Sequence, residues 1–380
     1  MYVPRAYEPL SAAISPEKVL VILGPRQVGK TTMVRRFMGE QSGRALFVHG
    51  DDVRTQANWG SNDLDLLLRM VEGYDVAVID EAQRIPSIGV SLKLLIDAGA
   101  TVKLIATGSS AFELAGQVGE PLTGRKRTLT LLPLSQVELR SIWNRFELTE
   151  KLDEFLVYGS YPEVITAATR EEKRAVLQEI TGSYLLKDIL ELDRVRSSKV
   201  LLDLLRLVAF QVGSEVSHRE LATQIGLDGK TVARYLDLLE KAYVLYNVRG
   251  FSRNLRKEVT KKSKYYFYDN GIRNAVIANF NELPDRDDRG ALWENFIFVE
   301  RLKRLTYRGQ AANAYFWRTW EGQEIDMVEE RGGRIAAYEM KWRRKGRAAA
   351  PKAWREAYPQ ATYTVITPEN YLKFVLGDDE

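Results

Sequence analysis

The feature that most constrains this chain is a glycine-rich octapeptide, residues 24–31 (GPRQVGKT), which fits the pattern G-x-x-x-x-G-K-[ST]. It follows the apolar, β-branched run 18–23 and precedes a helical pattern that starts at Thr31. In this strand–loop–helix context, backbone N–H groups turn toward phosphate oxygens and the helix dipole adds to the attraction. The sequence therefore predicts a phosphate-binding loop; the alternative is an ordinary glycine turn at a strand end.

The residue types in the loop suggest separate roles. Lys30 is expected to reach the β- and γ-phosphates of ATP, and the hydroxyl of Thr31 to bind Mg²⁺. The complete expected nucleotide-binding set is Gly24, Pro25, Arg26, Gln27, Val28, Gly29, Lys30, Thr31, Thr32 and Asp80.

Two acids follow another apolar run, Val76–Ile79. In P-loop enzymes the first acid, here Asp80, holds Mg²⁺ through water, and the second, Glu81, polarises the attacking water. A pair of surface acids at a strand end is the alternative.

The next apolar run, 102–106, leads into Thr107 and Ser109. Because ligands bind at the carboxyl edge of open parallel sheets, these side chains are candidates to sense the γ-phosphate. Thr-Gly-Ser is also an ordinary turn. Arg125 precedes a further strand and is a candidate to neutralise transition-state charge at a neighbouring subunit's nucleotide, with a plain surface arginine as the alternative.

The spacing of apolar runs predicts strands at 18–23, 45–49, 76–79, 102–106 and 127–132, with helices at 31–38, 63–72 and 92–97 between them. Strands that alternate with helices indicate βαβ units and a parallel sheet covered on both faces. Residues 135–210 are predicted to be helical, and Pro284 with 285–289 to form a linker.

The composition excludes several kinds of chemistry. The chain has no Cys and two His among 380 residues, so disulfides, thiolate nucleophiles, Cys-based metal sites and Ser-His-Asp triads are not expected. No stretch approaches a membrane span and residues 1–10 lack a signal-peptide core, so we expect a cytoplasmic protein that does not bind membranes. The net charge of +4 says little, but residues 249–264 and 341–352 are strongly basic.

The motifs above, together with Gly124-Arg125 and residues 132–135 (LPLS), resemble the AAA+ ATPases of bacteria and archaea that carry a C-terminal region of unknown function. The resemblance covers essentially the whole chain and implies ATP and Mg²⁺ as ligands and a homo-oligomer, with a ring as one form. Residues 159–162 (GSYP) look like the lid segment that contacts adenine in related ATPases, although the arginine of the origin-binding branch is Glu163 here.

Residues 217–249 predict a helix, a glycine turn, a second helix from Lys230 to Lys241 and a strand. This is the order of a winged helix, whose second helix can enter a major groove of DNA. The candidate DNA contacts are Lys230, Thr231, Arg234, Arg253, Arg256 and Lys257. A protein–protein module is the equally weighted alternative, because winged helices also bind protein partners.

The C-terminal part contains carboxylates near a lysine. Glu294 lies on a predicted helix (293–305), Asp326 ends the segment 322–326, and Glu339 and Lys341 share one face of a predicted strand. Two acids and a lysine suit a Mg²⁺ site with a cation that positions water. The pattern resembles the PD-(D/E)XK nucleases, which implies Asp326 and Glu339 as metal ligands, Lys341 as the water-positioning residue and Glu294 as an extra acid. An inactive scaffold of that fold is the alternative.

We therefore expect an α/β protein with four parts: a P-loop AAA+ domain (1–134), a helical lid (135–212), a winged helix (213–284) and a restriction-endonuclease-like domain (285–380). The predicted function is an ATPase that acts on DNA, with Lys30, Glu81, Ser109 and Arg125 as its catalytic set, and with Glu339 and Lys341 in a metal-dependent nuclease site. The main alternative is an ATP-dependent regulatory switch with an inactive nuclease-like domain. A protein unfoldase is a third option, with Trp59 as its weak support.

Overall fold

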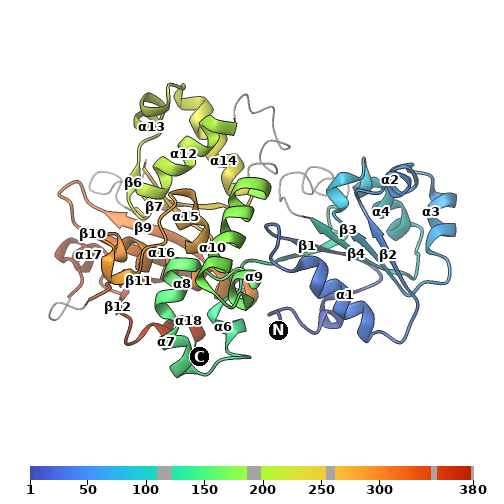
Figure 1. Ribbon diagram of the computed structural model, residues 1–380, viewed down its shortest axis with the longest axis horizontal. Coiled ribbons are helices and arrows are strands. Elements are labelled where there is room, and N and C mark those ends of the chain that lie inside the picture. The colour runs from blue at the N-terminus through green and yellow to red at the C-terminus, as the bar shows by residue number, and fades with distance from the viewer. Residues whose placement is uncertain (109–121, 186–197, 254–261, 344–348, 378–380) are drawn as a thin grey trace.

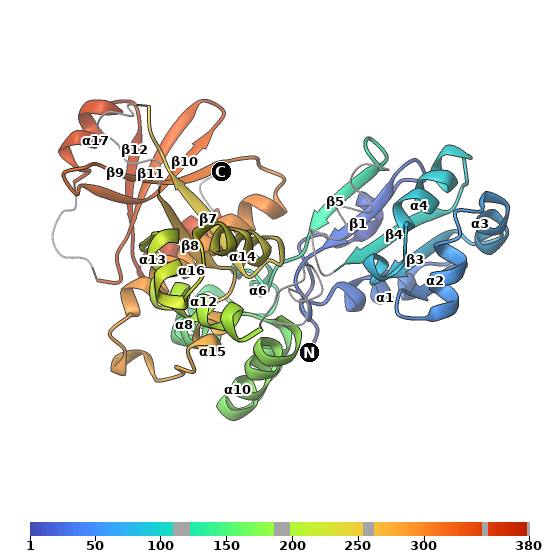
Figure 2. The same cartoon turned by 90° about the horizontal axis from the view of Figure 1, so that it is seen from above.

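The computed structural model describes residues 1–108, 122–185, 198–253, 262–343 and 349–377. Two sheets organise them. Figure 1 shows the first sheet and its helices, in blue and cyan, on one side, and the remaining elements, from green to red, on the other. Figure 2, turned by 90°, shows the same separation, with the N-terminal segment and α6 (Gln136–Leu139) between the two units.

The first unit is a five-stranded sheet in the order β2-β3-β4-β1-β5, and every neighbouring pair is parallel. All five strands predicted from the apolar runs are present. They are β1 (Val19–Leu23), β2 (Ala45–His49), β3 (Val76–Asp80), β4 (Lys103–Gly108) and β5 (Lys126–Thr130). The register aligns Leu23 with Gly108 and with Thr130, so the carboxyl ends of β1, β4 and β5 meet at one edge.

Both faces of this sheet are covered, because successive residues of a strand point to opposite sides. Leu20 and Ile22 of β1 pack with α1 (Lys30–Glu40) on one face. Val19, Val21 and Leu23 pack on the other face with Trp59, Leu67 and Leu92. Those three residues belong to α2 (Val53–Trp59), α3 (Leu64–Val71) and α4 (Ile88–Asp97). The prediction of a parallel sheet covered on both faces is confirmed.

Helix α2 was not predicted from the sequence. It is seven residues long, and the side chain of its N-cap, Asp52, accepts a hydrogen bond from Thr55 N at 2.9 Å. Trp59 anchors the helix in the core. The segment is too short to show a helical period, and its Asp cap and following Gly60 also suit a loop.

A series of helices follows the first unit, as predicted for 135–210. They are α6, α7 (Arg145–Glu150), α8 (Leu152–Tyr158), α9 (Pro162–Thr166), α10 (Arg170–Glu179), η3 (Ile180–Leu185) and α12 (Ser198–Phe210). Three of them begin with a capping box, in which Ser135, Asn144 or Thr169 exchanges hydrogen bonds with a Glu three residues later.

The helix–turn–helix–strand order expected after Ser217 is present. It consists of α13 (His218–Ile225), a left-handed Gly226, α14 (Gly229–Lys241) and β7 (Leu245–Gly250). The short β6 (Glu215–Val216) and β7 both pair with β8 (Ser263–Phe267) in antiparallel fashion.

These strands do not form a separate sheet. Strand β7 also pairs, in parallel, with β9 (Asn313–Arg318), which gives a seven-stranded sheet in the order β12-β11-β10-β9-β7-β8-β6. The other strands are β10 (Glu324–Arg331), β11 (Arg334–Met340) and β12 (Thr362–Ile366). The domain boundary that we expected at residue 284 therefore separates strands that belong to one continuous sheet.

The segment predicted as a linker is packed into the protein. It contains η4 (Leu283–Asp285), and Arg286, only 4% exposed, donates to both oxygens of Asp288 at 2.8 Å. Arg273 of α15 (Asn270–Val276) also pairs with Asp288. Charge and proline content suggested a linker, but Leu283 and Arg286 are buried, and the ion pair of Asp288 with Arg273 ties the segment to α15.

Helix α16 (Arg289–Tyr307) supports the second sheet. With α8 and α18 (Tyr371–Leu376) it forms a core that includes Trp293, Phe296 and Tyr371. The short α17 (Lys352–Ala357) packs through Trp354 in a smaller cluster.

Candidate functional site

The glycine loop has the backbone that a phosphate site requires. Gly24 has φ = 152°, and a Cβ atom there would lie 1.9 Å from the carbonyl oxygen of Leu131. Gly29 adopts a left-handed conformation (φ = 93°, ψ = 22°) and begins α1. Neither position accepts a side chain without strain or a clash, which explains the two glycines of the motif.

Lys30 is held inside this loop. It is 5% exposed, and its Nζ donates to the carbonyl oxygens of Gly24 and Pro25, both at 2.8 Å. The ammonium therefore lies within the curve of the loop, at the N-terminus of α1. A cation and a helix N-terminus at one point suit a polyanion.

Thr31 and Asp80 meet beside the loop, as the sequence predicted. The Thr31 hydroxyl lies 2.9 Å from Oδ2 and 3.1 Å from Oδ1 of Asp80, a residue that is 1% exposed. Thr107, at the end of β4, donates to Asp80 Oδ1 at 2.5 Å. A hydroxyl and a carboxylate are hard oxygen donors of the kind that Mg²⁺ prefers, so Thr31 and Asp80 fit this ion.

Glu81 directly follows Asp80 and has a left-handed backbone conformation (φ = 51°, ψ = 45°). Its Oε2 accepts a hydrogen bond from Gln83 at 2.5 Å, and its backbone N–H donates to the Thr107 hydroxyl at 3.2 Å. Thr107 thus connects both acids. Gln83 and His49, whose Nε2 lies 3.8 Å from Asp80 Oδ2, were not identified from the sequence. His49 ends β2, so the carboxyl-edge rule could have identified it.

Within this chain, Arg125 lies away from this site. Arg125 precedes β5 and so lies at the amino-terminal edge of the sheet, whereas the loop leaves the carboxyl edge of β1. Its Nε pairs with Asp97 at 2.5 Å, and the role expected toward a neighbouring subunit's nucleotide stays a prediction. Ser109 lies outside the described residues.

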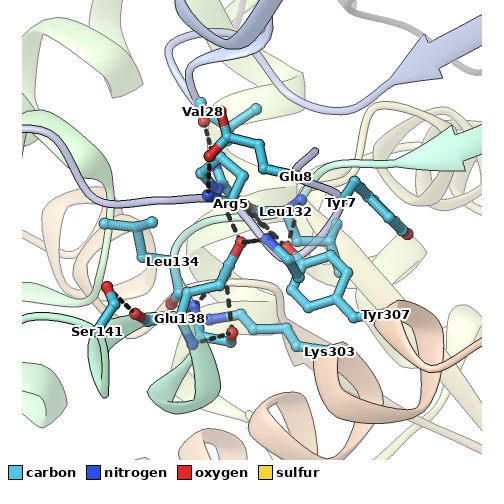
Figure 3. A network of polar contacts seen from close by, with 12 residues as sticks. Arg5, Tyr7, Glu8, Val28, Leu132, Leu134, Glu138, Ser141, Lys303 and Tyr307 are labelled. Carbon is cyan, nitrogen blue, oxygen red and sulfur yellow. Dashed lines mark hydrogen bonds and ion pairs between the residues drawn. The ribbon is translucent and has the colours of Figure 1, made fainter. Parts of the chain in front are cut away.

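Arg5, which the sequence analysis did not single out, contacts the phosphate loop. Arg5 is buried, and its guanidinium donates to the carbonyl oxygens of Val28 and Leu132, the latter at 2.6 Å. It also pairs with Glu138 of α6 at 2.8 Å and lies 3.3 Å from the hydroxyl of Tyr307 in α16 (Figure 3). The phosphate loop is thereby connected to the second unit.

A second group of contacts lies beside this arginine. Lys303 of α16 donates to the Leu134 carbonyl at 3.0 Å, to Glu300 at 2.8 Å and to the Ser160 hydroxyl at 3.2 Å. Ser160 belongs to the segment expected to act as a lid, and its N–H donates to Asp269 at 2.7 Å. The expected lid is therefore fixed to both α16 and the turn after β8.

The C-terminal carboxylates lie on or near β10 and β11, and Lys264 of β8 reaches them. Asp326 accepts a hydrogen bond from Met340 N at 2.7 Å, and Lys341 pairs with Glu339 at 2.5 Å. Burial raises the pKa of Asp326, and burial together with the Asp326 charge raises that of Glu339. Asp326 lies on β10 and Glu339 on the neighbouring β11, whereas the sequence had predicted a strand only for the Glu339 segment.

A buried lysine that the sequence reading had counted only in a basic run lies in this group. Lys264 of β8 is 2% exposed, and its Nζ lies 2.5 Å from Glu324 and 3.6 Å from Glu294. Burial alone would lower the pKa of Lys264, but the charges of Glu294, Glu324 and Asp326 raise it, so the lysine stays protonated. Burial raises the pKa of Glu294 to about 7, and the Tyr266 hydroxyl donates to it at 2.7 Å.

The expected three-acid metal set is not formed. In the described parts of the chain, no three His, Cys, Asp or Glu side chains come together in a way that could hold a metal ion. Glu294 is engaged by Lys264 at 3.6 Å and by the Tyr266 hydroxyl at 2.7 Å, although the nearby charge of Asp326 contributes to its raised pKa. The structure therefore brings Asp326, Glu339, Lys341 and Glu294 into one electrostatic group that also contains Lys264.

The candidate DNA contacts differ in exposure. Lys230 and Arg234 are exposed on α14, whereas the Thr231 hydroxyl donates to Asp228 at 2.6 Å at the start of this helix. Arg253 pairs with Glu330 at 3.1 Å. Arg256 and Lys257 lie outside the described residues.

None of the helices in the described ranges is both long and apolar enough to cross a membrane.

Comparison with known families divides the chain into three regions. Residues 16–140 match the family model of the AAA domain. Residues 149–283 match a domain of unknown function (DUF8612), and residues 289–377 match another (DUF4143).

Similar proteins occur in bacteria and archaea. An uncharacterized protein of Mycobacterium tuberculosis is 28% identical over 336 residues, which cover 87% of this chain and 72% of that protein. An uncharacterized protein of Methanocaldococcus jannaschii is 24% identical over 309 residues, which cover 76% and 67%.

Solved structures show more distant likeness. A Walker-type ATPase of Pyrococcus abyssi has 16% identity and a TM-score of 0.45, over 70% of this chain and 93% of that one. The RuvB Holliday junction branch migration motor of Thermotoga maritima has 19% identity and a TM-score of 0.29, over 64% and 84%. Both TM-scores lie below 0.5, so the assignment rests on the AAA family match and the site geometry. Residues 16–140 thus form an AAA-like P-loop ATPase domain, which the chain joins to two regions that match families of unknown function.

Proposed function

We propose that this protein hydrolyses Mg-ATP at the phosphate loop and uses the turnover to change how its second unit engages DNA. The observation that carries the ATPase part is the meeting of Thr31 with Asp80 beside the buried ammonium of Lys30. This arrangement provides cationic, hydroxyl and carboxylate groups at one end of a parallel sheet, where ligands of such sheets bind.

Each residue has a definite task in the proposed reaction. Lys30 exchanges its hydrogen bonds to loop carbonyls for bonds to phosphate oxygens. Thr31 and Asp80 hold Mg²⁺, which when bound offsets charge on the phosphates. Glu81 polarises the attacking water, and Thr107 fixes the relative positions of Asp80 and Glu81 through its two hydrogen bonds.

Two variants test this part. Lys30→Ala should abolish measurable ATP binding, because it removes the ammonium from the loop. Glu81→Gln should keep binding and lower kcat by roughly 10²–10⁴-fold, the usual contribution of a general base. Lys103→Ala and Glu72→Gln are controls at exposed positions away from the carboxyl edge. Wild-type turnover in both test variants would reject the ATPase assignment.

The DNA part of the proposal rests on α14. This helix follows a tight glycine turn, and it exposes Lys230 and Arg234 near its first turns. Exposed cations on the second helix of such a pair suit the phosphates and base edges of a major groove. Arg253 adds a further cation beyond β7.

DNA affinity should therefore fall steeply as salt rises, and DNA should stimulate ATP turnover. Lys230→Ala should weaken binding similarly for all DNA sequences and reduce the salt slope by about one. Salt-independent or undetectable DNA binding, with ATP turnover intact, would leave a protein–protein module as the better description.

A second candidate function is an ATP-dependent regulatory switch whose C-terminal unit cuts nothing. The specific observation in its favour is Lys264, a cation already paired with the acids of the nuclease-like group. The test is cleavage of duplex, single-stranded and branched DNA with Mg²⁺ or Mn²⁺. Cleavage lost in Asp326→Ala and Lys341→Ala, with ATP turnover kept, would support a nuclease; no cleavage of any form would support the switch.

Assembly into a homo-oligomer, with a ring as one form, is part of the same proposal. A mass measurement in solution with and without ATP tests it. An unchanged monomer under both conditions would reject it.

A further inference from the structure

A hollow lies at the end of the second sheet where β10 turns into β11. It has room for about 1040 Å³. One wall is the β10–β11 hairpin, with residues 331–336, and another is the segment 357–362 between α17 and β12. Arg253, which follows β7, also lines it. Three separate segments of the chain therefore build this hollow.

The lining of the hollow carries an excess of positive charge. Its described lining residues include three arginines, Arg253, Arg331 and Arg334, and a single acid, Glu329. Glu329 is 3% exposed, and both of its carboxylate oxygens accept hydrogen bonds from Arg301, at 2.8 and 3.0 Å. Its contact with Arg331 is longer, at 3.9 Å. Glu329 therefore offsets only part of the positive charge.

Arg331 and Arg334 lie directly opposite each other in the antiparallel β10–β11 pair. Gly332 and Gly333 between them both have a positive φ (55° and 77°), as the tightest hairpin turns require. Arg331 donates to the amide oxygen of Gln310 at 2.9 Å, a neutral partner that leaves its charge in place. Like charges directly opposite in a sheet destabilise it. The hairpin thus holds two guanidinium groups together at a cost that a bound anion would offset.

Arg253 brings a cation from another segment. Its backbone N–H donates to the Tyr358 hydroxyl at 3.1 Å, which fixes the chain at this point. Its guanidinium pairs with Glu330 at 3.1 Å, but both side chains are partly exposed, and pairs of this kind contribute little to stability. Arg253 can therefore exchange this partner for a phosphate at small cost.

We propose that this hollow binds the phosphate backbone of DNA, with one phosphate between Arg331 and Arg334 and a neighbouring phosphate at Arg253. The inference rests on the proposed action on DNA and adds a surface to it. Guanidinium groups bind phosphate oxygens through two parallel hydrogen bonds, so arginine suits this ligand better than lysine. Of these arginines, the sequence singled out only Arg253 as a DNA contact.

The arrangement favours DNA over an acidic peptide. The charges of a DNA strand recur at regular intervals along its backbone, as cations from separate segments require. An acidic peptide must also order its long carboxylate side chains, which costs conformational entropy. Contacts to phosphates position a strand without reading its sequence, so this surface should bind all DNA sequences alike.

The hollow is separate from the other candidate sites of the second unit. Asp326 lies near the start of β10 and Glu339 near the end of β11, whereas the hollow lies at the opposite ends of these strands. Figures 1 and 2 show α17 on the side of the second unit away from the parallel sheet, with α14 closer to that sheet. DNA bound at the hollow therefore contacts a different face from DNA bound at α14.

The first test titrates the full chain, without ATP, into a fluorescently labelled duplex at several salt concentrations and measures anisotropy. Arg331→Gln/Arg334→Gln should lower affinity roughly ten-fold or more, the effect of losing charge-assisted hydrogen bonds, and reduce the salt slope by about one. Arg334→Lys keeps the charge but loses the fork, so it should lower affinity less and keep the slope. Arg140→Gln/Arg145→Gln removes two exposed arginines elsewhere and should change neither.

A second measurement separates binding from a structural role of the arginines. Without DNA, Arg334→Gln should unfold in urea at the wild-type midpoint or above it, because the variant removes the repulsion between opposed like charges. A lower midpoint together with weaker DNA binding would make the arginine a structural residue and overturn the inference.

Other ligands identify the source of the phosphate. In Lys30→Ala, whose phosphate loop is disabled, inorganic tripolyphosphate and polyglutamate should both bind much more weakly than DNA. Either ligand binding as tightly as DNA, and losing this affinity in Arg331→Gln/Arg334→Gln, would overturn the assignment to DNA.

The outcome also separates this inference from the proposed function. Unchanged DNA affinity in Arg331→Gln/Arg334→Gln, with weaker binding in Lys230→Ala, would overturn the inference and leave the proposed action on DNA intact. A wild-type protein that binds no DNA at any salt concentration would overturn both.

Discussion

The hydroxyl of Thr31 lies 2.9 Å from a carboxylate oxygen of Asp80, although 49 residues separate them in the chain. The parallel order β3-β4-β1 brings them together, because β1 and β3 both end at the same edge with one strand between them. Asp80 is anchored further by Thr107 from that intervening strand. The magnesium site of the proposed ATPase is thus built by strand order.

Asp80→Asn should therefore impair the use of Mg²⁺. We expect a roughly 10–100-fold loss of metal affinity or turnover, the usual effect of removing a group that holds a metal or its ligands. A Mg²⁺ titration of the ATP hydrolysis rate measures it, with exposed Asp65→Asn as the control. An unchanged titration curve would exclude Asp80 from the metal site.

Arg5 should matter for stability more than its position near the terminus suggests. Its ion pair with Glu138 is almost fully buried, with side chains 3% and 1% exposed. Arg5→Met leaves a buried carboxylate unpaired, which costs about 3 kcal/mol or more. Urea unfolding should show a lower midpoint, whereas Arg36→Ala, which breaks an exposed pair with Glu40, should change stability by less than about 1 kcal/mol.

The double variant Arg5→Met/Glu138→Leu provides an internal check. Replacing both charges by apolar groups should recover part of the loss, because no charge is then left buried alone. A double variant that loses as much as the sum of the two single variants would show that the ion pair is not the cause.

Lys264→Met should destabilise the second unit. The change leaves Glu294 and Glu324 without their shared cation, and breaking such a buried pair costs about 3 kcal/mol. Thermal unfolding measures the effect. Lys262→Met is the control: Lys262 is exposed, and its buried partner Glu215 keeps a second cation, Arg318, at 3.3 Å, so this variant should unfold close to the wild-type temperature.

Glu294 should make stability fall as pH rises from about 4.5 to 7. Burial raises its pKa to about 7 in the folded protein, so the folded state holds a proton that the unfolded state has already lost in this range. Glu294→Gln keeps an acceptor for Tyr266 and removes the titration. Relative to this variant, the wild type should lose stability between pH 5 and pH 8.

The difference between the two proteins reports on Glu294 together with the carboxylates whose charges interact with it. Asp326 and Glu339, whose pKa values are also raised, act in the same direction and remain in the variant. His218, whose pKa burial lowers, acts in the opposite direction and also remains. Parallel urea midpoints for wild type and variant across this pH range would contradict the prediction.

The sequence predicted those parts of the fold that depend on local pattern. Apolar runs located all five strands of the first sheet, and the glycine loop and Asp80 identified the phosphate site. Both signals can be read from consecutive residues: an apolar run marks a buried strand, and the glycine spacing marks the phosphate loop. Thr107 was also identified, since it directly follows the predicted strand 102–106.

The contacts that join the two units could not be predicted in this way. Arg5 meets Tyr307 across 302 residues, and Lys264 looks in the sequence like one of seven cations in a basic run. The pairing of β7 with β9 depends on the same kind of long-range packing. Such residues carry no periodic signal, so only the assembled fold reveals them.

The proposed coupling of ATP turnover to DNA predicts that ATP and DNA affinities are linked. Coupling between sites is commonly 5–150-fold and is reciprocal, so ATP should change DNA affinity by the factor with which DNA changes ATP affinity. Lys30→Ala should bring this factor to one, because it abolishes ATP binding. Lys230→Ala should instead weaken DNA binding with and without ATP and leave the factor unchanged. DNA affinities measured with and without a non-hydrolysable ATP analogue distinguish these results, and a factor of one in the wild type would mean that the nucleotide does not act on the second unit.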